Sequence, residues 1–101
     1  MSFDKKVWNL TRRIPPGRVT TYGLIAKKLG TKAYRAVGNA LNRNRDKRVP
    51  CHRVVKSTGE VGGFAGGTKE KTRMLRKEGV RVKRWAKEDR IDGLESFLFR
   101  L

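Results

Sequence analysis

Residues 21–42 read TYGLIAKKLGTKAYRAVGNALN, and this stretch decides the fold. Its first half has apolar residues at helical spacing, with Thr21 placed to cap the helix and Gly30 placed to end it. The apolar positions are Tyr22, Ile25, Ala26 and Leu29.

The second half predicts another helix, which Thr31 is placed to cap. Its apolar side would hold Ala33, Val37, Ala40 and Leu41. Two short helices joined through a glycine, the second rich in Arg and Asn, are typical of a DNA-binding helix-turn-helix. A helical hairpin in a small core has the same spacing, so the pattern alone leaves both interpretations open.

The flanking sequence adds shorter elements. Spacing of three or four between apolar residues predicts a helix over 3–13, which Pro15-Pro16-Gly17 ends. Further helices are expected from Thr68 to Glu78 and from the capping pattern Asp92-x-x-Glu95, with a strand over 80–82. We therefore expect one domain over 1–101 that is mostly α with short strands, a winged helix-turn-helix-like DNA-binding fold.

The charge distribution indicates a polyanionic partner. Lys and Arg number 26 against nine acidic residues, a net charge of +17. No acidic residue lies between Asp4 and Asp46. Neutralising phosphates releases counterions, so double-stranded DNA is the expected partner. A solvated basic surface, or a ribosome-associated protein, is the alternative.

Other classes are disfavoured. No apolar run is long enough to span a bilayer, and the N-terminus lacks the apolar stretch of a secretion signal. A single cysteine forms no internal disulfide, and there is no Cys/His cluster at metal-ligand spacing. We expect a cytoplasmic, nucleoid-associated monomer without a metal.

The only cysteine, Cys51, stands beside the only histidine, His52, in a basic stretch. Positive charge from Arg48, His52 and Arg53 would favour the nucleophilic thiolate. Neighbouring residues point in different directions, so His52 would accept the thiol proton through a bridging water. The alternative is an inert cysteine buried in the core.

The sequence Pro50-Cys51-His52-Arg53-Val54-Val55 resembles the signature of the O6-alkylguanine-DNA alkyltransferases. Other motifs of that family occur in the same order over about residues 3–80. They are Val19-Thr20-Thr21-Tyr22, Arg35-Ala36-Val37-Gly38, Asn44, Ser57-x-Gly59, Gly62, Gly66-Gly67, Lys71 and Leu75-x-x-Glu78-Gly79.

The resemblance implies a role for each matching residue. Cys51 would accept the alkyl group from guanine O6, His52 would deprotonate it through water, and Glu78 would orient His52. Tyr22 would donate a proton or hydrogen bond to the leaving guanine, and Asn44 would brace the turn beside the site.

The resemblance also implies DNA contacts and a pocket. Arg35 would enter the duplex and fill the space of the extruded base, from a recognition helix lying in the minor groove. The remaining expected DNA contacts are Thr21, Ala36, Arg43, Lys32 and Arg53. The expected pocket wall comprises Tyr22, Val54, Phe64, Ala65 and Gly66. The thioether product is stable, so the protein would act once, without a cofactor or metal.

Departures from the family pattern are confined to a few places. Most members carry an additional N-terminal domain, which we expect this chain to lack. Phe64 and Ala65 stand where many members have tyrosine and serine, which removes two hydroxyl groups from the pocket wall. The segments between Asn44 and Cys51 and between Tyr22 and Arg35 are each one residue shorter. These changes bear on lesion affinity more than on chemistry.

Two other functions fit parts of this pattern. An alkyltransferase-like protein binds O6-alkylguanine and flags it for other repair machinery, and such proteins are also short. They typically replace the acceptor cysteine, whereas Cys51, His52 and Glu78 are all present here. A plain helix-turn-helix protein with a structural cysteine would leave the motif around Cys51 and the glycine-rich loop unexplained.

Overall fold

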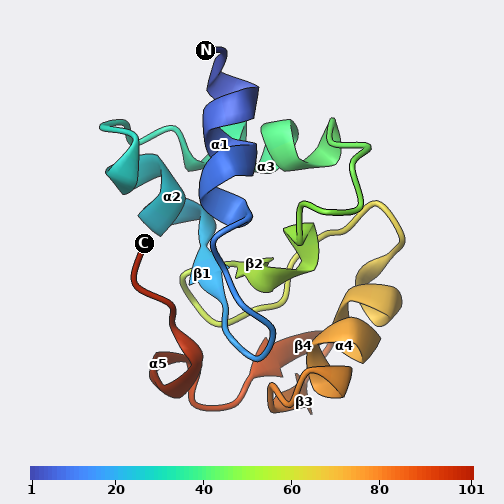
Figure 1. Cartoon of the computed structure of the whole chain (residues 1–101). Coiled ribbons are helices and arrows are strands. Elements are labelled where there is room, and N and C mark those ends of the chain that lie inside the picture. The colour runs from blue at the N-terminus through green and yellow to red at the C-terminus, as the bar shows by residue number, and fades with distance from the viewer.

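The computed structural model describes all 101 residues, and Figure 1 shows helices gathered around a small amount of sheet. The helices are α1 (Phe3–Thr11), α2 (Tyr22–Lys28), α3 (Tyr34–Asn42), α4 (Thr68–Lys77) and α5 (Leu94–Phe97), with a 3-10 turn η1 (Cys51–Arg53). The strands are β1 (Thr20–Thr21), β2 (Val54–Val55), β3 (Val82–Trp85) and β4 (Glu88–Ile91). The prediction of a mostly helical chain with short strands is confirmed.

The helix-turn-helix forms largely as its sequence predicts. The Thr21 hydroxyl accepts a hydrogen bond from the Leu24 amide at 3.1 Å and so caps α2. Gly30 follows α2 with φ +76°, a conformation that costs a residue with a side chain more than it costs glycine.

The start of α3 was predicted wrongly. The helix begins at Tyr34 rather than after Thr31, because the Thr31 hydroxyl accepts from the Ala33 amide and closes a separate turn. Ala33 therefore lies outside the helix and is exposed, whereas Val37, Ala40 and Leu41 are buried as expected.

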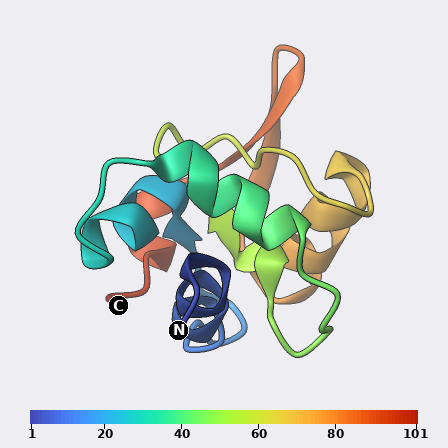
Figure 2. The ribbon, with the colours of Figure 1, turned by 90° about the horizontal axis from the view of Figure 1, so that it is seen from above.

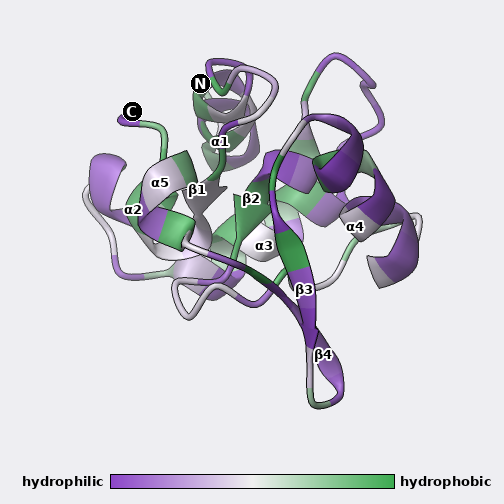
Figure 3. Cartoon of the chain, turned by 90° about the horizontal axis from the view of Figure 1, so that it is seen from below, coloured by the Kyte–Doolittle hydropathy of each residue, from purple (hydrophilic) through white to green (hydrophobic).

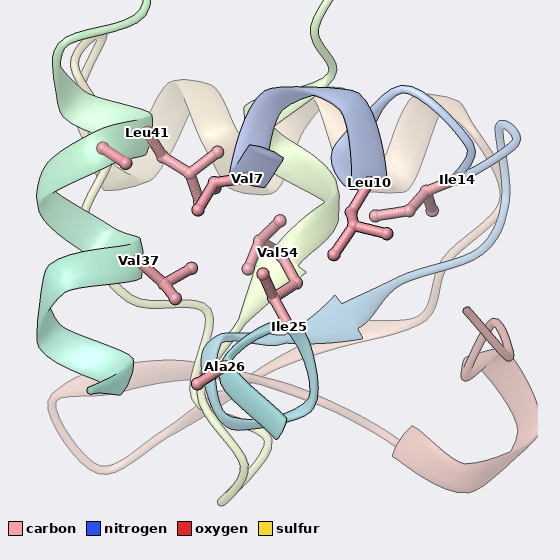
Figure 4. Packing of buried hydrophobic residues seen from close by; sticks show 9 residues of the cluster. Val7, Leu10, Ile14, Ile25, Ala26, Val37, Leu41 and Val54 are labelled. Atoms are coloured by element: carbon pink, nitrogen blue, oxygen red, sulfur yellow. The ribbon is translucent and has the colours of Figure 1, made fainter. Parts of the chain in front are cut away.

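Two buried apolar clusters hold the fold together. The first comprises Val7, Leu10, Ile14, Ile25, Ala26, Val37, Ala40, Leu41 and Val54, which join α1, α2, α3 and β2 (Figure 4). The second comprises Val19, Val55, Val61, Leu75, Val80, Val82 and Ile91. Strand β2 pairs in parallel with β1 and connects the clusters, since Val54 belongs to the first and Val55 to the second.

The C-terminal region differs most from expectation. Strands β3 and β4 form an antiparallel hairpin that projects from the body (Figure 2), although only a strand over 80–82 was predicted. Its outer part is hydrophilic, whereas Val82 and Ile91 at its base are buried (Figure 3).

The last helix is also shorter than predicted. Helix α5 has four residues, and Gly93 in a left-handed conformation precedes it, so Asp92 does not cap it. Leu98 leaves helical geometry and bridges to Val19. No helix in the structure combines the length and apolar character that crossing a membrane requires.

Candidate functional site

An open cavity of about 1770 Å³ lies between α3, the loop over 44–50, η1 and the glycine-rich loop over 62–67. The loop from β2 to α4, yellow-green to yellow in Figure 2, runs alongside α3. Of the predicted site residues, the cavity wall includes Tyr22, Arg35, Asn44, Cys51, His52, Arg53, Phe64 and Ala65. The structure therefore brings together residues that lie far apart in the sequence.

Cys51 is half-buried in η1 and faces this cavity. The Asn44 amide donates to its Sγ at 3.5 Å and to the Asp46 carbonyl at 2.8 Å, while the Asn44 Oδ1 accepts from the Asp46 amide. Asn44 thus closes the turn before the site and also contacts the sulfur. Its predicted bracing position matches this geometry.

The expectation that nearby cations favour the thiolate at rest is wrong. Burial raises the pKa of Cys51, and this outweighs the opposing hydrogen bond from Asn44 and the nearby charge of Lys71. Arg48 binds Asp46 instead, with its Nη2 2.9 Å from Oδ2. Cys51 is consequently a thiol at neutral pH, and forming its thiolate would require a base.

The candidate base is His52, whose side chain is 7 % exposed. Burial lowers the pKa of His52 despite the opposing effect of Glu78, so the imidazole is neutral and can accept a proton at neutral pH. Its Nε2 lies 3.1 Å from Glu78 Oε2, but the pair lacks the alignment of a hydrogen bond. The pair is therefore a close contact between a neutral ring and a carboxylate.

Glu78 is fixed mainly by Arg53. The Arg53 Nε lies 3.0 Å from Glu78 Oε1, and its Nη1 donates to the Ile14 carbonyl at 2.8 Å. Burial raises the pKa of Glu78, but the hydrogen bonds from Arg53 and the close contact with His52 outweigh it and leave the pKa below its usual range. Figure 1 shows residues 51–55, in light green, between α3 and α4. Glu78 is the C-cap residue of α4.

Arg53 is largely committed to groups within the protein. Its side chain is 14 % exposed, and its guanidinium bonds Glu78 and the Ile14 carbonyl. Arg53 also lines the cavity, and its role as a DNA contact stays a prediction.

Tyr22 begins α2 and lines the cavity, and Gly38 and Gly62 lie beside its ring. A Cβ at Gly38 would meet its Cε1 at 3.8 Å, and one at Gly62 would meet its hydroxyl at 3.4 Å. Burial, followed by the charge on Cys51, raises the pKa of Tyr22, so the phenol keeps its proton. Glycine at these positions leaves room for the aromatic ring in the cavity wall.

Several other predicted contacts are placed differently from expectation. Val54 is fully buried outside the cavity wall, and its carbonyl accepts from Lys71. Thr21 is 4 % exposed and its hydroxyl caps α2. Arg43 is exposed but binds Asp4 through two hydrogen bonds, at 2.7 and 2.8 Å. Gly66 is exposed beside Phe64 but is not part of the cavity wall.

The remaining predicted contacts are accessible. Arg35 is exposed in the first turn of α3, forms no ion pair and lies 6.0 Å from the centroid of the Tyr34 ring. Lys32 lines a smaller hollow between α2 and α3, and Ala36 is half-buried. These positions stay predicted DNA contacts.

One buried residue close to the site was given no role by the sequence analysis. Lys71 has no exposed surface, and its Nζ contacts the Tyr22 hydroxyl, the Val54 carbonyl and the Gly63 carbonyl. Lys71 falls within the motif order noted above, but an isolated lysine in an amphipathic helix does not reveal that it is buried. Only the packing of α4 against the cavity shows it.

The fold and site define a class: a small helix-turn-helix domain with a half-buried cysteine in an open cavity. Residues 2–80 match the family described as 6-O-methylguanine DNA methyltransferase, DNA binding domain. The chain therefore belongs to this family.

Similar proteins agree with that assignment over part of their length. The chain is 49 % identical over 79 residues to a methylated-DNA–protein-cysteine methyltransferase of Methanosarcina acetivorans, which is 76 % of this chain and 51 % of that protein. A protein of the same name from Shigella flexneri is 46 % identical over 79 residues, 76 % of this chain and 46 % of that one. The chain thus spans about half the length of these relatives.

Solved structures extend the likeness to the C-terminal region. S. pombe Atl1, solved in complex with damaged DNA containing O6-carboxymethylguanine, has a TM-score of 0.86 and 30 % identity, covering 98 % of this chain and 95 % of that chain. Mycobacterium tuberculosis OGT in complex with DNA has a TM-score of 0.73 and 39 % identity, covering 77 % and 50 %. The first likeness includes the hairpin and α5, which lie beyond residue 80.

Proposed function

We propose that the protein repairs DNA by moving an alkyl group, such as methyl, from guanine O6 to the sulfur of Cys51. The observation that carries the proposal is the grouping of Cys51, Asn44, Tyr22 and His52 in one cavity, with Glu78 in contact with His52. The family relationship and the names of the relatives support the same reaction.

The buried imidazole and carboxylate support the first step. With His52 Nε2 against Glu78, Nδ1 is the ring nitrogen that would receive the thiol proton through a bridging water. The sulfur then attacks the alkyl carbon, forms the S–C bond and breaks the C–O6 bond, whose electrons return to the purine. Glu78 stabilises the imidazolium in this state.

The leaving guanine needs a proton or hydrogen bond as charge develops on it. Tyr22 is protonated at neutral pH and lines the same cavity as Cys51, so it would supply that bond. The thiol proton ends on the restored guanine, and the thioether is not reversed by ordinary thiols. The protein would therefore be consumed in one turnover.

Access to the reacting carbon requires the nucleotide to rotate out of the duplex, which costs a few kcal/mol of unstacking. The exposed, unpaired Arg35 on the first turn of α3 would occupy the vacated position. The net charge of +17 on the chain also favours binding to DNA. The glycine-rich loop would give the extruded base a flexible wall.

The test is intact-mass measurement after incubation with a duplex that contains one O6-methylguanine. We expect the wild type to gain one methyl group on Cys51 and Cys51→Ser to gain none while still binding the duplex. Arg35→Ala should slow transfer from duplex DNA far more than from the free base. Equal losses on both substrates would exclude the finger role of Arg35.

A second function is favoured by one observation, the similarity to Atl1 over nearly the whole of both chains. On that alternative the protein binds O6-alkylguanine and marks it for other repair machinery without removing the alkyl group. The same measurement separates the two functions. Specific binding of the O6-methylguanine duplex, with no mass gained by either wild type or Cys51→Ser, would support the alternative.

A further inference from the structure

Lys71 is a fully buried lysine with no carboxylate partner. Its Nζ lies 2.7 Å from the Val54 carbonyl, 3.1 Å from the Gly63 carbonyl and 3.2 Å from the Tyr22 hydroxyl. It also lies 5.6 Å from the centroid of the Tyr22 ring. Burying an ammonium without a counter-ion is unfavourable, so its position calls for a reason other than packing.

The hydrogen-bond donors of Lys71 and the acceptors around it give that reason. An ammonium group has three N–H donors and no acceptor, and three oxygen atoms surround this one. Each N–H is therefore used, and the Tyr22 oxygen must accept one of them. The single proton of that hydroxyl cannot point back at Lys71, and no hydrogen bond from it to another protein atom occurs, so it faces the cavity.

We propose that Lys71 is a positioning residue that holds the Tyr22 hydroxyl as a donor toward the extruded base. This inference rests on the proposed function, because it concerns the bond that Tyr22 gives to the leaving guanine. Lys71 acts through Tyr22 and does not itself touch the base.

A neutral amine would reverse this arrangement. It has two N–H donors, which the carbonyls of Val54 and Gly63 would occupy, and a lone pair that would accept from Tyr22. The phenol proton would then turn away from the cavity. Protonated Lys71 thus favours the donating orientation, and deprotonated Lys71 opposes it.

Both forms are accessible near neutral pH, because burial lowers the pKa of Lys71 to about 7. The charged and titratable groups around it are Cys51 and His52 on η1, Lys56 after β2, and Tyr22 on α2. A thiolate at Cys51 raises the pKa of Lys71 and Lys56 lowers it. Forming the nucleophile therefore favours the ammonium form that orients Tyr22.

The test is a double-mutant cycle of Lys71→Met and Tyr22→Phe, read as the single-turnover rate of methyl transfer at pH 6.5. Lys71→Met alone should slow transfer by about tenfold or more, the loss expected for an oriented bond to developing charge. In the Tyr22→Phe background it should slow transfer less than about twofold, because the group that it positions is gone. Equal effects in both backgrounds would overturn the proposal.

Lys77→Met is the matched control, since Lys77 is exposed near the end of the same helix. It should transfer methyl at the wild-type rate. A slowdown equal to that of Lys71→Met would show that any charge lost from α4 has this effect, and the proposal would fail.

A second measurement does not use the Lys71 variant, so it remains valid if that variant misfolds. The rate ratio of wild type to Tyr22→Phe should shrink as pH rises from 6 to 9, because neutral Lys71 turns the phenol proton away. A constant ratio would contradict the proposal.

The two proposals can fail separately. If the wild type transfers no methyl group, the proposed reaction fails, and the same cycle is read as the affinity for an O6-methylguanine duplex relative to an unmodified one. Coupling between Lys71 and Tyr22 in that affinity would support the positioning role. Independent effects would overturn it.

Discussion

The two buried clusters are built differently. The first joins the three N-terminal helices, and all nine of its buried residues fall between Val7 and Val54. The second takes residues from Val19 to Ile91, including Val82 and Ile91 at the base of the hairpin. The family match ends at residue 80, so the second cluster is completed by residues beyond it.

The difference shows how the site is supported from two sides. Cys51 packs against the first cluster, and Leu75 in the second belongs to α4, which also carries Lys71 and leads into Glu78. Cys51 is therefore placed by the helix-turn-helix, whereas Lys71 and Glu78, which contact Tyr22 and His52, are placed by α4. The following predictions test this division.

The largest effect is expected at Arg53, which bonds Ile14 of the first cluster and Glu78 at the end of α4. Arg53→Met leaves Glu78 largely buried without its main partner, which should reduce the free energy of unfolding by about 3–5 kcal/mol. Urea unfolding at pH 7 measures this loss. The loss should shrink at a pH below the Glu78 pKa, where the carboxyl group becomes neutral. A loss independent of pH would mean that packing alone is responsible.

A slightly smaller loss is expected in the second cluster. Leu75→Ala removes a fully buried side chain and should destabilise the protein by about 2–4 kcal/mol. Ile25→Ala is the matched variant in the first cluster, and it is also fully buried. One shared transition by far-UV and near-UV circular dichroism is expected for both. Separate melting of α4 in the Leu75 variant would show that the clusters unfold independently.

The third prediction concerns the pH dependence contributed by Lys71. Its pKa is about 7 in the folded protein and 10.5 in the unfolded chain, so between these values the unfolded chain binds the extra proton. Stability should therefore rise from pH 7 to pH 9, by about 2–3 kcal/mol if this group dominates.

Above pH 9 the trend should reverse, because burial raises the pKa values of Cys51 and Tyr22 in the folded state. Denaturant titrations at several pH values measure the curve. Lys71→Met should flatten the rise between pH 7 and 9 and Lys77→Met should preserve it. A rise that survives in Lys71→Met belongs to another group.

The smallest effect lies within the first cluster. The Trp8 Nε1 donates to the Ala40 carbonyl at 2.8 Å and ties α1 to α3. Trp8→Phe keeps an aromatic ring at this position but removes this bond. The free energy of unfolding should fall by about 1 kcal/mol. Thermal unfolding checks the change, and methyl transfer should stay at the wild-type rate. Slower transfer would mean that α1 also positions the site.

Local signals made much of the helical half predictable. Thr21 and Gly30 bound α2 because a hydroxyl cap and a positive φ act on neighbouring backbone atoms. The start of α3 was missed because Thr31 bonds the Ala33 amide in a separate turn, and the helix begins after Ala33 without a side-chain cap. The hairpin was missed because its strands are mostly polar, with Val82 and Ile91 buried at the base and Trp85 exposed at the outer end.

The candidate site was only partly predictable. The motif around Cys51 identified the cysteine and the histidine, and the separate motif Leu75-x-x-Glu78-Gly79 identified Glu78, which contacts His52 in the structure. The protonation of Cys51 was not predictable, because it depends on burial and on the pairing of Arg48 with Asp46. The bonds from Arg53 to Glu78 were not predictable either, because a sequence does not show which arginine meets a carboxylate.

The sequence by itself determined the excess of positive charge, the helix-turn-helix periodicity and the short motif that carries Cys51. Each of these depends on composition or on residues a few positions apart. Tertiary structure decided which charged groups are buried and what they contact. Arg53 meets Glu78 across 25 positions and Lys71 meets Tyr22 across 49, and contacts at such separations exist only once the chain has packed.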